Sequence, residues 1–338
     1  MIKKDNKLDY KNKIFKYINA NGNDKLSEYS GLDLQELLLL IDNYYLSLRN
    51  NLNLDKEITF GLEIELENTS LIDISRKMKN LNLKDTWHIE KDASLTDGAE
   101  IISPILIDNC NTWKDLKKIC LAVFNIASVD EKSGGHIHVG TQALGNEYQS
   151  WLNFCKLWST YENIFNRFLY GEYLNARLSL KKYAPPVAEK FKDVNKLFEL
   201  VDDKFFIYTD QKYLGVSFFH VKNRDIKEKN TIEFRSPNSS KNPIIHQNNI
   251  NLLVKTLSYC KSSSFNDDIV SKRLISNCDY NLNLDLYNEI YLQQALELAD
   301  LLFKNNKDKV YFLRQYFKSY EIADPRIKQL QPSKKFTK

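Results

Sequence analysis

Residues 58–68, ITFGLEIELEN, alternate strictly between apolar and polar or small side chains. A period of two predicts a β-strand with one buried face, because successive side chains of a strand point to opposite faces of its sheet. The polar face carries Glu63, Glu65 and Glu67 with no lysine or arginine among them. Such a face usually lies in water. The other predicted strands must show whether these glutamates lie in water or form part of a site.

Three further short stretches combine an apolar face with a short charged face. They are GGHIHVG with His136 and His138, NTIEFRSP with Glu233 and Arg235, and AEIISP with Glu100. A water-facing sheet would mix lysine, asparagine, glutamine and serine into these positions. Clustered carboxylates instead suit hard divalent cations such as Mg²⁺, and an added imidazole suits Mn²⁺. Together the four stretches favour a concave sheet that holds metal.

The rest of the composition favours one compact unit over separable modules. The chain has 338 residues, of which 43% are hydrophobic and 12% aromatic, so it can form a substantial core. It contains only ten glycines and seven prolines, and no glycine/serine-rich or proline-rich linker interrupts it. We expect a helical extension at 1–55, a catalytic domain at 56–262 and a helical region at 263–338 that packs on that domain.

Charge, hydropathy and cysteine spacing exclude several classes of partner. The 48 basic and 44 acidic residues leave a net charge of +4, which makes no case for nucleic acid. The longest leucine/isoleucine run, LLLLI, is far shorter than the ~20 residues that span a bilayer. The opening MIKKDNKLDYKNK is followed by no apolar segment, so we expect no signal peptide. Five cysteines without CxxC spacing are typical of reduced thiols, and we expect a cytoplasmic protein.

Hydrophobic periodicity predicts an α+β fold with a mostly antiparallel sheet, since some strands are joined by helices and others by direct turns. We expect strands at 57–67, on both sides of a turn at Asp97-Gly98, at 134–140, and within 204–209, 214–221 and 230–236. We expect helices within 33–50, 70–82, 112–127 and 147–170, and from about 245 to 320. The residues around Pro185-Pro186 form a loop or lid candidate.

The motifs FGLEIELE, DASLTDGAEIISP, SGGHIHVG and TIEFRSPN, in this order, resemble the putative amidoligase family. That family belongs to the carboxylate–amine ligase superfamily of glutamine synthetase and glutamate–cysteine ligase. The resemblance covers residues 57–260. It implies a glutamine-synthetase-like fold, in which helices flank a curved, mostly antiparallel sheet.

The resemblance also implies roles for individual residues, in a site that uses ATP and two Mg²⁺ or Mn²⁺ ions. The implied metal ligands are Glu63, Glu65, Asp92, Glu100, His136 and Glu233, with Glu90 as a rival to Asp92. His136 would also lie near the ATP phosphates. Arg235 and Arg177 are the implied phosphate- or substrate-binding arginines. Neither GxxxxGK[ST] nor GxGxxG occurs, so ATP would be held by metal ions and arginines.

The implied reaction is ATP-dependent joining of a carboxylate, either a small molecule or a peptide, to an amine. Phosphorylation of the carboxylate gives an acyl phosphate, which the amine attacks. The first alternative is a zinc amide hydrolase in which the HxH pair holds Zn²⁺. The second is a non-catalytic binding protein on the same fold. Neither substrate nor oligomeric state follows from the sequence.

Several other polar residues are assigned ordinary roles. His138 is expected to be a structural partner of the site, not a ligand. Glu67, at the end of its strand, is expected to be solvated. Three histidines are read as unremarkable parts of the fold: His88, His220 and His246. Trp87 and Trp158 are expected in the core, and Ser94 and Ser103 in binding turns.

Overall fold

The computed structural model describes residues 12–13, 16–17, 22–42, 44–83, 85–92, 94–130, 132–173, 177–188, 212–221, 230–276 and 289–317. Within these residues the chain combines helices with an open antiparallel sheet, so the α+β class is confirmed. The strands are β1 (Phe60–Glu67), β2 (His88–Glu90), β3 (Gly98–Ile102), β4 (Gly135–Gly140), β5 (Val216–Ser217) and β6 (Thr231–Phe234). Their order across the sheet is β2-β3-β1-β4-β6-β5, and every pairing is antiparallel.

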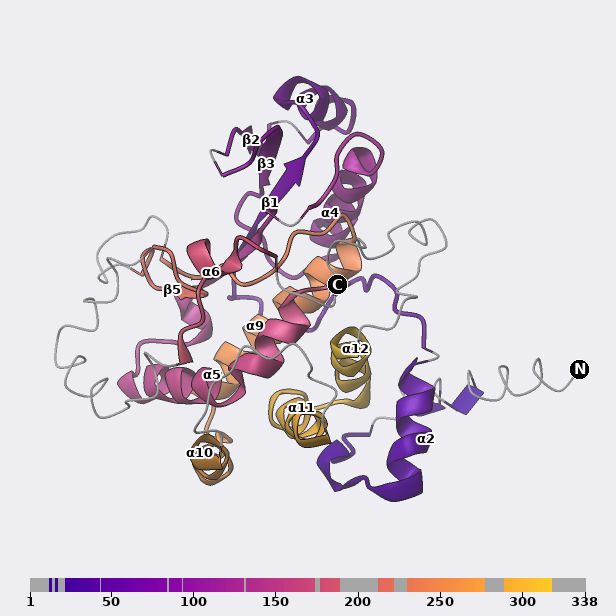
Figure 1. Ribbon diagram of the computed structural model, residues 1–338, viewed down its shortest axis with the longest axis vertical. Helices are drawn as coiled ribbons and strands as arrows, with labels where there is room; N and C mark the ends of the chain where they lie inside the picture. The colour runs from indigo at the N-terminus through magenta and orange to yellow at the C-terminus, as the bar shows by residue number, and fades with distance from the viewer. Residues whose placement is uncertain are drawn as a thin grey trace, which may run out of the picture.

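The apolar face of the sheet packs on α4 (Cys110–Val123), α5 (Tyr148–Leu169) and α9 (Pro243–Lys261) (Figure 1). Phe60 of β1 stacks on Trp113 of α4 with ring centroids 5.5 Å apart. Phe234 of β6 contacts Trp158 of α5 at 5.3 Å. The alternation seen in β1 is therefore used as expected, because its apolar side chains meet this helical layer while its glutamates face the other way.

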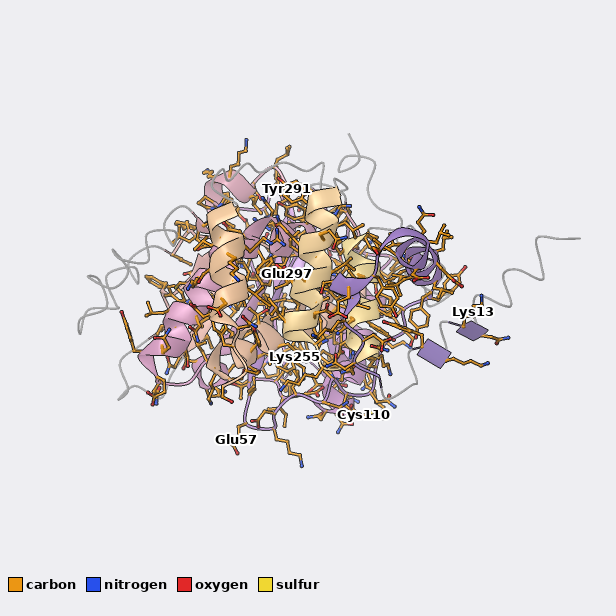
Figure 2. The ribbon with its side chains drawn as sticks, turned by 90° about the horizontal axis from the view of Figure 1, so that it is seen from below. Lys13, Glu57, Cys110, Lys255, Tyr291 and Glu297 are labelled. Atoms are coloured by element: carbon orange, nitrogen blue, oxygen red, sulfur yellow. The ribbon has the colours of Figure 1, made fainter. Side chains whose placement is uncertain are left out.

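A second group of helices lies outside α5 and α9. It contains η1 (Leu26–Glu28), α2 (Gly31–Asp42), α10 (Asp267–Ser276), α11 (Glu289–Leu302) and α12 (Asn306–Tyr316). Figure 2 shows part of this layer, with Tyr291 and Glu297 labelled on α11. Glu297 accepts two hydrogen bonds of 3.0 Å from Arg273 of α10. The described parts of 1–55 and 263–338 pack on each other as well as on the sheet-bearing domain, since η1 contacts α11 and α2 contacts α12.

The helix expected within 33–50 ends at Asp42, and residues 44–55 continue without helical structure. Their backbone N–H groups are hydrogen-bonded to side chains of distant elements instead. Arg49 N donates to Gln247 Oε1 over 2.8 Å, and Leu52 N donates to both carboxylate oxygens of Asp108. Tertiary partners therefore replace the helical hydrogen bonds that the leucine and tyrosine spacing predicted.

The hairpin of β2 and β3 also differs from its prediction. The strands are joined by residues 91–97, and Gly98 is the first residue of β3 instead of the second residue of a tight turn. A Cβ at Gly98 would lie 2.1 Å from the carbonyl oxygen of Leu66, so this close pairing with β1 requires glycine. The predicted strand at 214–221 contributes only the two residues of β5, and the one at 204–209 lies outside the described residues.

Three short elements complete the connections: α3 (Leu71–Asn80) beside β2, η2 (Thr141–Ala143) after β4, and α6 (Leu180–Tyr183) after α5. In the part of the chain that the structure describes, every helix is too short or too polar to cross a lipid bilayer.

Candidate metal centre

Strand register brings the predicted carboxylates and imidazoles together on the face of the sheet opposite α4, α5 and α9. Glu63 of β1 lies opposite His136 of β4. Glu65 of β1 lies opposite Glu100 of β3. These strands all pair antiparallel, and residues that lie opposite one another across a pair point to the same face of the sheet. Side chains from three separate stretches of sequence therefore converge on one surface.

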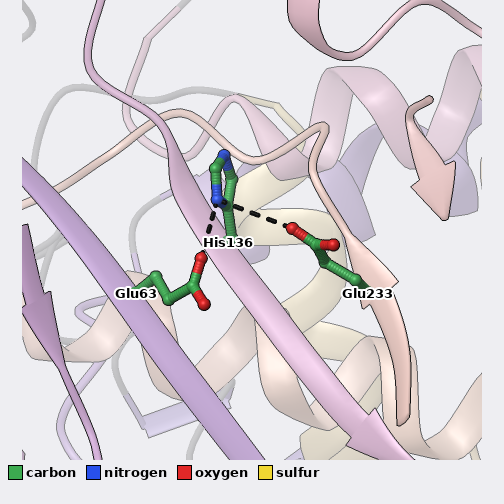
Figure 3. Close-up of side chains that lie close together, drawn as sticks. All are labelled: Glu63, His136 and Glu233. Carbon is green, nitrogen blue, oxygen red and sulfur yellow. Dashed lines mark hydrogen bonds and ion pairs between the residues drawn. The ribbon is translucent and has the colours of Figure 1, made fainter. Parts of the chain in front are cut away.

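The first group of possible ligands consists of Glu63, His136 and Glu233 (Figure 3). Nδ1 of His136 lies 3.0 Å from Oε2 of Glu63 and 3.8 Å from Oε1 of Glu233. One ligand atom from each side chain lies within 4.8 Å of the other two. Glu233 and His136 are buried, so the three side chains are held by their surroundings and are not a loose surface cluster.

The second group consists of Glu65, Glu100 and the same histidine. Nε2 of His136 lies 3.4 Å from Oε1 of Glu65, while Oε2 of Glu65 accepts a hydrogen bond of 2.5 Å from the backbone of Gly134. His136 thus turns one ring nitrogen toward each group. A neutral imidazole has a single lone pair for coordination, so it can ligate an ion in only one of the two groups while its other nitrogen donates a hydrogen bond.

Crowding of negative charge perturbs the carboxyl groups of this surface. Burial, followed by the negative charges of Glu63, Glu65, Asp92 and Glu90, raises the pKa of Glu100 to about 9. Glu63 behaves differently. Its burial favours the neutral acid, but hydrogen bonds from His136 and His138 outweigh that effect and hold its pKa well below the usual range.

Glu233 contains an unusual buried oxygen. Its Oε1 accepts a hydrogen bond from Nη1 of Arg235, whereas its Oε2 has no hydrogen-bond partner among the described residues. The Nε2 atom of His220 lies 3.7 Å from this Oε2, beyond hydrogen-bond distance. A buried carboxylate oxygen without a donor costs free energy unless a cation occupies its lone pairs. This orphaned atom, together with the neighbouring carboxylates and imidazole, fits a divalent cation.

His138 takes part in the centre through Glu63. Its Nε2 lies 2.9 Å from Oε1 of Glu63, and its Nδ1 lies 3.3 Å from Oγ1 of Thr231. It belongs to neither group of ligands whose atoms converge. The structure therefore places His138 as a residue that orients Glu63, in keeping with the structural role expected for it.

The two implied ligands from the β2–β3 hairpin lie in different places. Asp92 lines the cleft in front of Glu65 and His136, with its Oδ1 accepting a hydrogen bond from the backbone of Ser94. Glu90 is exposed on the edge strand and lies 3.6 Å from Nε2 of the exposed His88. Asp92 belongs to neither converging group, but of the two rivals it alone lines the cleft.

Arg177 reaches the centre from the segment after α5, yet most of its guanidinium binds backbone. It donates to the carbonyl oxygens of Pro237 over 2.6 Å and of Arg235 over 2.7 Å. Burial lowers its pKa to about 10, partly offset by the negative charge of Glu65. The contacts indicate that Arg177 fixes the chain after β6, and so places Arg235.

The lack of a side chain at Gly134 leaves space in front of the two groups of possible ligands. A Cβ at this position would lie 2.9 Å from Nε2 of His136, 3.1 Å from Oε1 of Glu65 and 3.2 Å from Nη2 of Arg177. Any side chain there would fill the volume between the imidazole, the carboxylate and the guanidinium. The glycine before β4 thus keeps the floor of the cleft open.

The cleft has a volume of about 330 Å³ and extends from the acidic floor to a rim of basic and aromatic residues. It is lined by Glu65, Asp92, Ser94, Lys132, His136, Arg177, Ser179, Tyr183, Lys212, Tyr213 and Arg235. Sequence reasoning missed the two lysines and two tyrosines of the rim, because Lys132, Lys212 and Tyr213 come from irregular segments and Tyr183 ends the four-residue helix α6. It also gave no site role to His220, whose Nε2 lies 3.7 Å from Oε2 of Glu233.

One assignment was wrong, and several others agree with the structure. Glu67 is buried, and its two carboxylate oxygens accept hydrogen bonds from the backbone N–H groups of Thr96 and Asp97. It thus holds the end of the β2–β3 connection against β1. Trp87 and Trp158 lie in the core as expected, and His246 is a buried structural residue bonded to the Ser240 carbonyl.

Comparison with known proteins adds no assignment: no protein-family model matches this chain, and no curated protein matches it either. The chemistry of the centre must therefore be argued from its own residues.

Proposed function

We propose that this chain is an ATP-dependent carboxylate–amine ligase that forms an amide through an acyl phosphate. The observation that carries the proposal is the pair of overlapping ligand groups, which share His136 at the floor of a cleft. Four carboxylates and one imidazole form a donor set suited to Mg²⁺ or Mn²⁺. Their order along the chain is also the order in the motifs that resemble the putative amidoligase family.

Cations bound by these groups would stabilise negative charge on a transferred phosphoryl group. The first group would use Glu63 and Glu233, and the second Glu65 and Glu100. Asp92, which lines the cleft but belongs to neither group, would contribute a further carboxylate near the cations. The unpartnered oxygen of Glu233 supports this reading, because a cation would satisfy it.

Arg235 is the residue best placed to contact a phosphoryl oxygen. Its Nη1 is held by Glu233, and its Nε donates to the Tyr183 carbonyl over 3.2 Å. These two contacts fix the plane of the guanidinium at the cleft, which leaves its remaining N–H groups to bind an oxyanion. Arg177 supports this arrangement by binding the carbonyl of Arg235 itself.

The proposed reaction balances in two steps. A carboxylate oxygen of the acid substrate attacks the γ-phosphorus of ATP, and ADP leaves with the electrons of the broken P–O bond. The amine nitrogen then attacks the acyl carbon, phosphate leaves with the electrons of the C–O bond, and the nitrogen loses a proton. The cleft must exclude water during the first step, since water would hydrolyse the acyl phosphate.

The contacts of the HxH pair weigh against a zinc hydrolase. A zinc site built on this pair would need both imidazoles to point at one ion. Here His136 faces the two ligand groups, whereas both nitrogens of His138 are engaged, with Glu63 and with Thr231. Only one histidine of the pair therefore contributes to a converging group among the described residues.

The test is ATP turnover measured against a panel of carboxylic acids and amines, followed by mass spectrometry of the product. We expect ADP, phosphate and an amide with one acid and one amine. Glu63→Gln should lower turnover by at least about 10²-fold, because one stabilising group of the transition state is lost. Glu57→Gln is the matched control, since Glu57 is exposed just before β1.

Thermal unfolding separates the proposal from its alternatives. Mg²⁺ with ATP should raise the unfolding temperature of a ligase, because both bind only the folded state. A rise with Zn²⁺ alone, combined with hydrolysis of an amide, would favour the hydrolase. The absence of both ATP turnover and any nucleotide-dependent rise would favour a non-catalytic binding protein.

A further inference from the structure

The rim of the cleft must contain cations that are free to meet an anionic substrate. Of the two arginines of the cleft, Arg177 binds three backbone carbonyls, and Arg235 has its charge offset by Glu233 although some of its N–H groups are left to bind an oxyanion. The floor itself is negative. An anion that approaches through this cleft therefore needs further positive charge at the rim.

Lys132 lies at this rim with its ammonium group bonded only to a neutral hydroxyl among the described residues. Its Nζ donates to Oγ1 of Thr96 over 2.6 Å. The nearby carboxylate of Asp130 binds the backbone N–H of Lys132 and the hydroxyl of Ser133, not the ammonium. The charge of Lys132 is thus not neutralised by a described carboxylate.

Lys212 lines the same cleft from a different segment. Within the described part of the chain it forms no salt bridge, and its side chain is exposed. Its backbone carbonyl accepts a hydrogen bond from Leu214 N, and Gly215 N donates to the Pro185 carbonyl over 2.8 Å. These contacts hold the 212–215 segment beside residues 177–188.

The same segment, 177–188, also holds Lys132. Oγ of Ser179 donates to the Lys132 carbonyl over 3.0 Å, while Nε of Arg177 donates to the same hydroxyl oxygen over 3.1 Å. One short stretch of chain therefore places both lysines around a single cleft. Because both backbones are held, an anion at the mouth would have to order only the two lysine side chains and not the segments that carry them.

We infer that Lys132 and Lys212 form a cationic clamp that binds an oxyanion of the substrate above the acidic floor. This inference rests on the proposed ligase function, which requires both a polyphosphate and a carboxylate at the cleft. The polyphosphate and the carboxylate are both oxyanions that offer several oxygen acceptors. Lysine ammonium groups bind such groups as point charges and do not impose the planar geometry of an arginine.

The nucleotide polyphosphate is the better match for the clamp, because its charge is greater than that of a single carboxylate. Two lysines on separate segments can contact a chain of phosphates that runs from the metal centre toward the mouth of the cleft. Tyr183 and Tyr213 lie at this mouth with ring centroids 5.9 Å apart, and the guanidinium carbon of Arg235 lies 5.6 Å from the centroid of the Tyr213 ring.

The experiment measures binding of inorganic triphosphate, and separately of glutarate, by calorimetry in the presence of Mg²⁺. The variants are Lys132→Met and Lys212→Met, which keep the apolar stem of each side chain. Lys114→Met is the control, because Lys114 is exposed on α4, away from the cleft. Each rim variant should bind triphosphate about fivefold to tenfold more weakly, with a smaller dependence on salt.

The outcomes are distinguishable. Weaker triphosphate binding in both rim variants, with unchanged Mn²⁺ binding in the absence of anion, supports the clamp. Weaker glutarate binding with unchanged triphosphate binding assigns the lysines to the acid substrate instead. Binding of both probes within twofold of wild type in both variants overturns the inference. Lysine-dependent triphosphate binding in a protein that forms no amide would support the clamp and count against the ligase.

Discussion

Two buried charged clusters of this molecule have opposite charge balance. In the helical layer, Arg49 forms a 2.5 Å ion pair with Asp308, and both side chains are more than nine-tenths buried. Asp308 also accepts hydrogen bonds from Asn251 and Asn305. One guanidinium thus meets one carboxylate, and the guanidinium lies 4.4 Å from the centroid of the Tyr311 ring.

The sheet face has no such balance. Four carboxylates gather there, whereas among the described residues Arg235, which binds Glu233, is the one arginine in an ion pair with any of them. The pKa of Glu100 is raised to about 9, first by burial and then by its negative neighbours. A protein that folds for stability alone would gain nothing from this arrangement. The comparison teaches that balanced buried charge serves the fold, while the unbalanced carboxylates of the sheet face are what the proposed metal site would require.

The largest effect is expected in the balanced cluster. Arg49→Ala leaves the carboxylate of Asp308 buried without its cation, so unfolding in urea should show a loss of about 3–5 kcal/mol. The loss should be equal with and without Mn²⁺, because this pair lies outside the metal centre. A loss below about 1 kcal/mol would mean that water or a neighbouring group replaces the arginine.

The second-largest effect is expected in the cluster on the sheet face. Here the quantity that changes is ATP turnover, and not the free energy of unfolding. Arg235→Lys should reduce ATP turnover nearly as much as Arg235→Ala, by about 10²–10³-fold. A lysine cannot bind Glu233, the Tyr183 carbonyl and a phosphate at once, as a planar guanidinium can. Steady-state kinetics at saturating Mg²⁺ measures this. Wild-type turnover in the lysine variant would show that charge alone is needed there.

A smaller effect should separate the two histidines of β4. His136→Ala should raise the Mn²⁺ concentration needed for half-maximal turnover by more than about 100-fold, whereas His138→Ala should raise it about tenfold. The difference arises because His136 reaches both ligand groups, while His138 acts through Glu63. His88→Ala, on the exposed edge strand, serves as the control. Parallel loss of bound Zn²⁺ in both variants would contradict the ligase.

Strand parity explains how much of the centre the sequence could predict. A period of two fixes the face of every strand residue, so Glu63, Glu65, Glu100, His136 and Glu233 could be placed on one surface before any coordinates. The α+β class and the antiparallel sheet followed from the same pattern. The metal, the nucleotide and the reaction stay predictions, because no pattern of the fold specifies them.

Residues outside regular strands could not be predicted in this way. Glu67 has the parity of its neighbours, but the backbone N–H groups of Thr96 and Asp97 bury it, and that contact depends on how a distant connection folds back. His220 lies in a turn after β5, and the strand expected at 214–221 ends at Ser217, so no period orients this side chain. Lys132 and Lys212 line one cleft because the segment 177–188 binds the backbone of Lys132 and of Gly215, three residues after Lys212.

The smallest effect concerns Glu100, and it tests the charge imbalance directly. The folded metal-free protein keeps this carboxyl protonated up to about pH 9, whereas the unfolded chain loses the proton near 4.5. The folded state therefore binds more protons between these values, and its stability falls as the pH rises through them. Glu100→Gln should remove that part of the pH dependence, because the amide cannot ionise.

We expect Glu100→Gln to match wild-type stability near pH 5 and to exceed it by about 1–2 kcal/mol at pH 8 in the absence of metal. Saturating Mn²⁺ should reverse the order, because the variant lacks a ligand. Asp308→Asn is the matched control in the balanced cluster, where loss of the charge should destabilise the protein at both pH values. Urea unfolding of both variants at each pH decides the question. A Glu100→Gln variant that is less stable than wild type at pH 8 without metal would show that this carboxylate is balanced after all, and would remove the main difference between the two clusters.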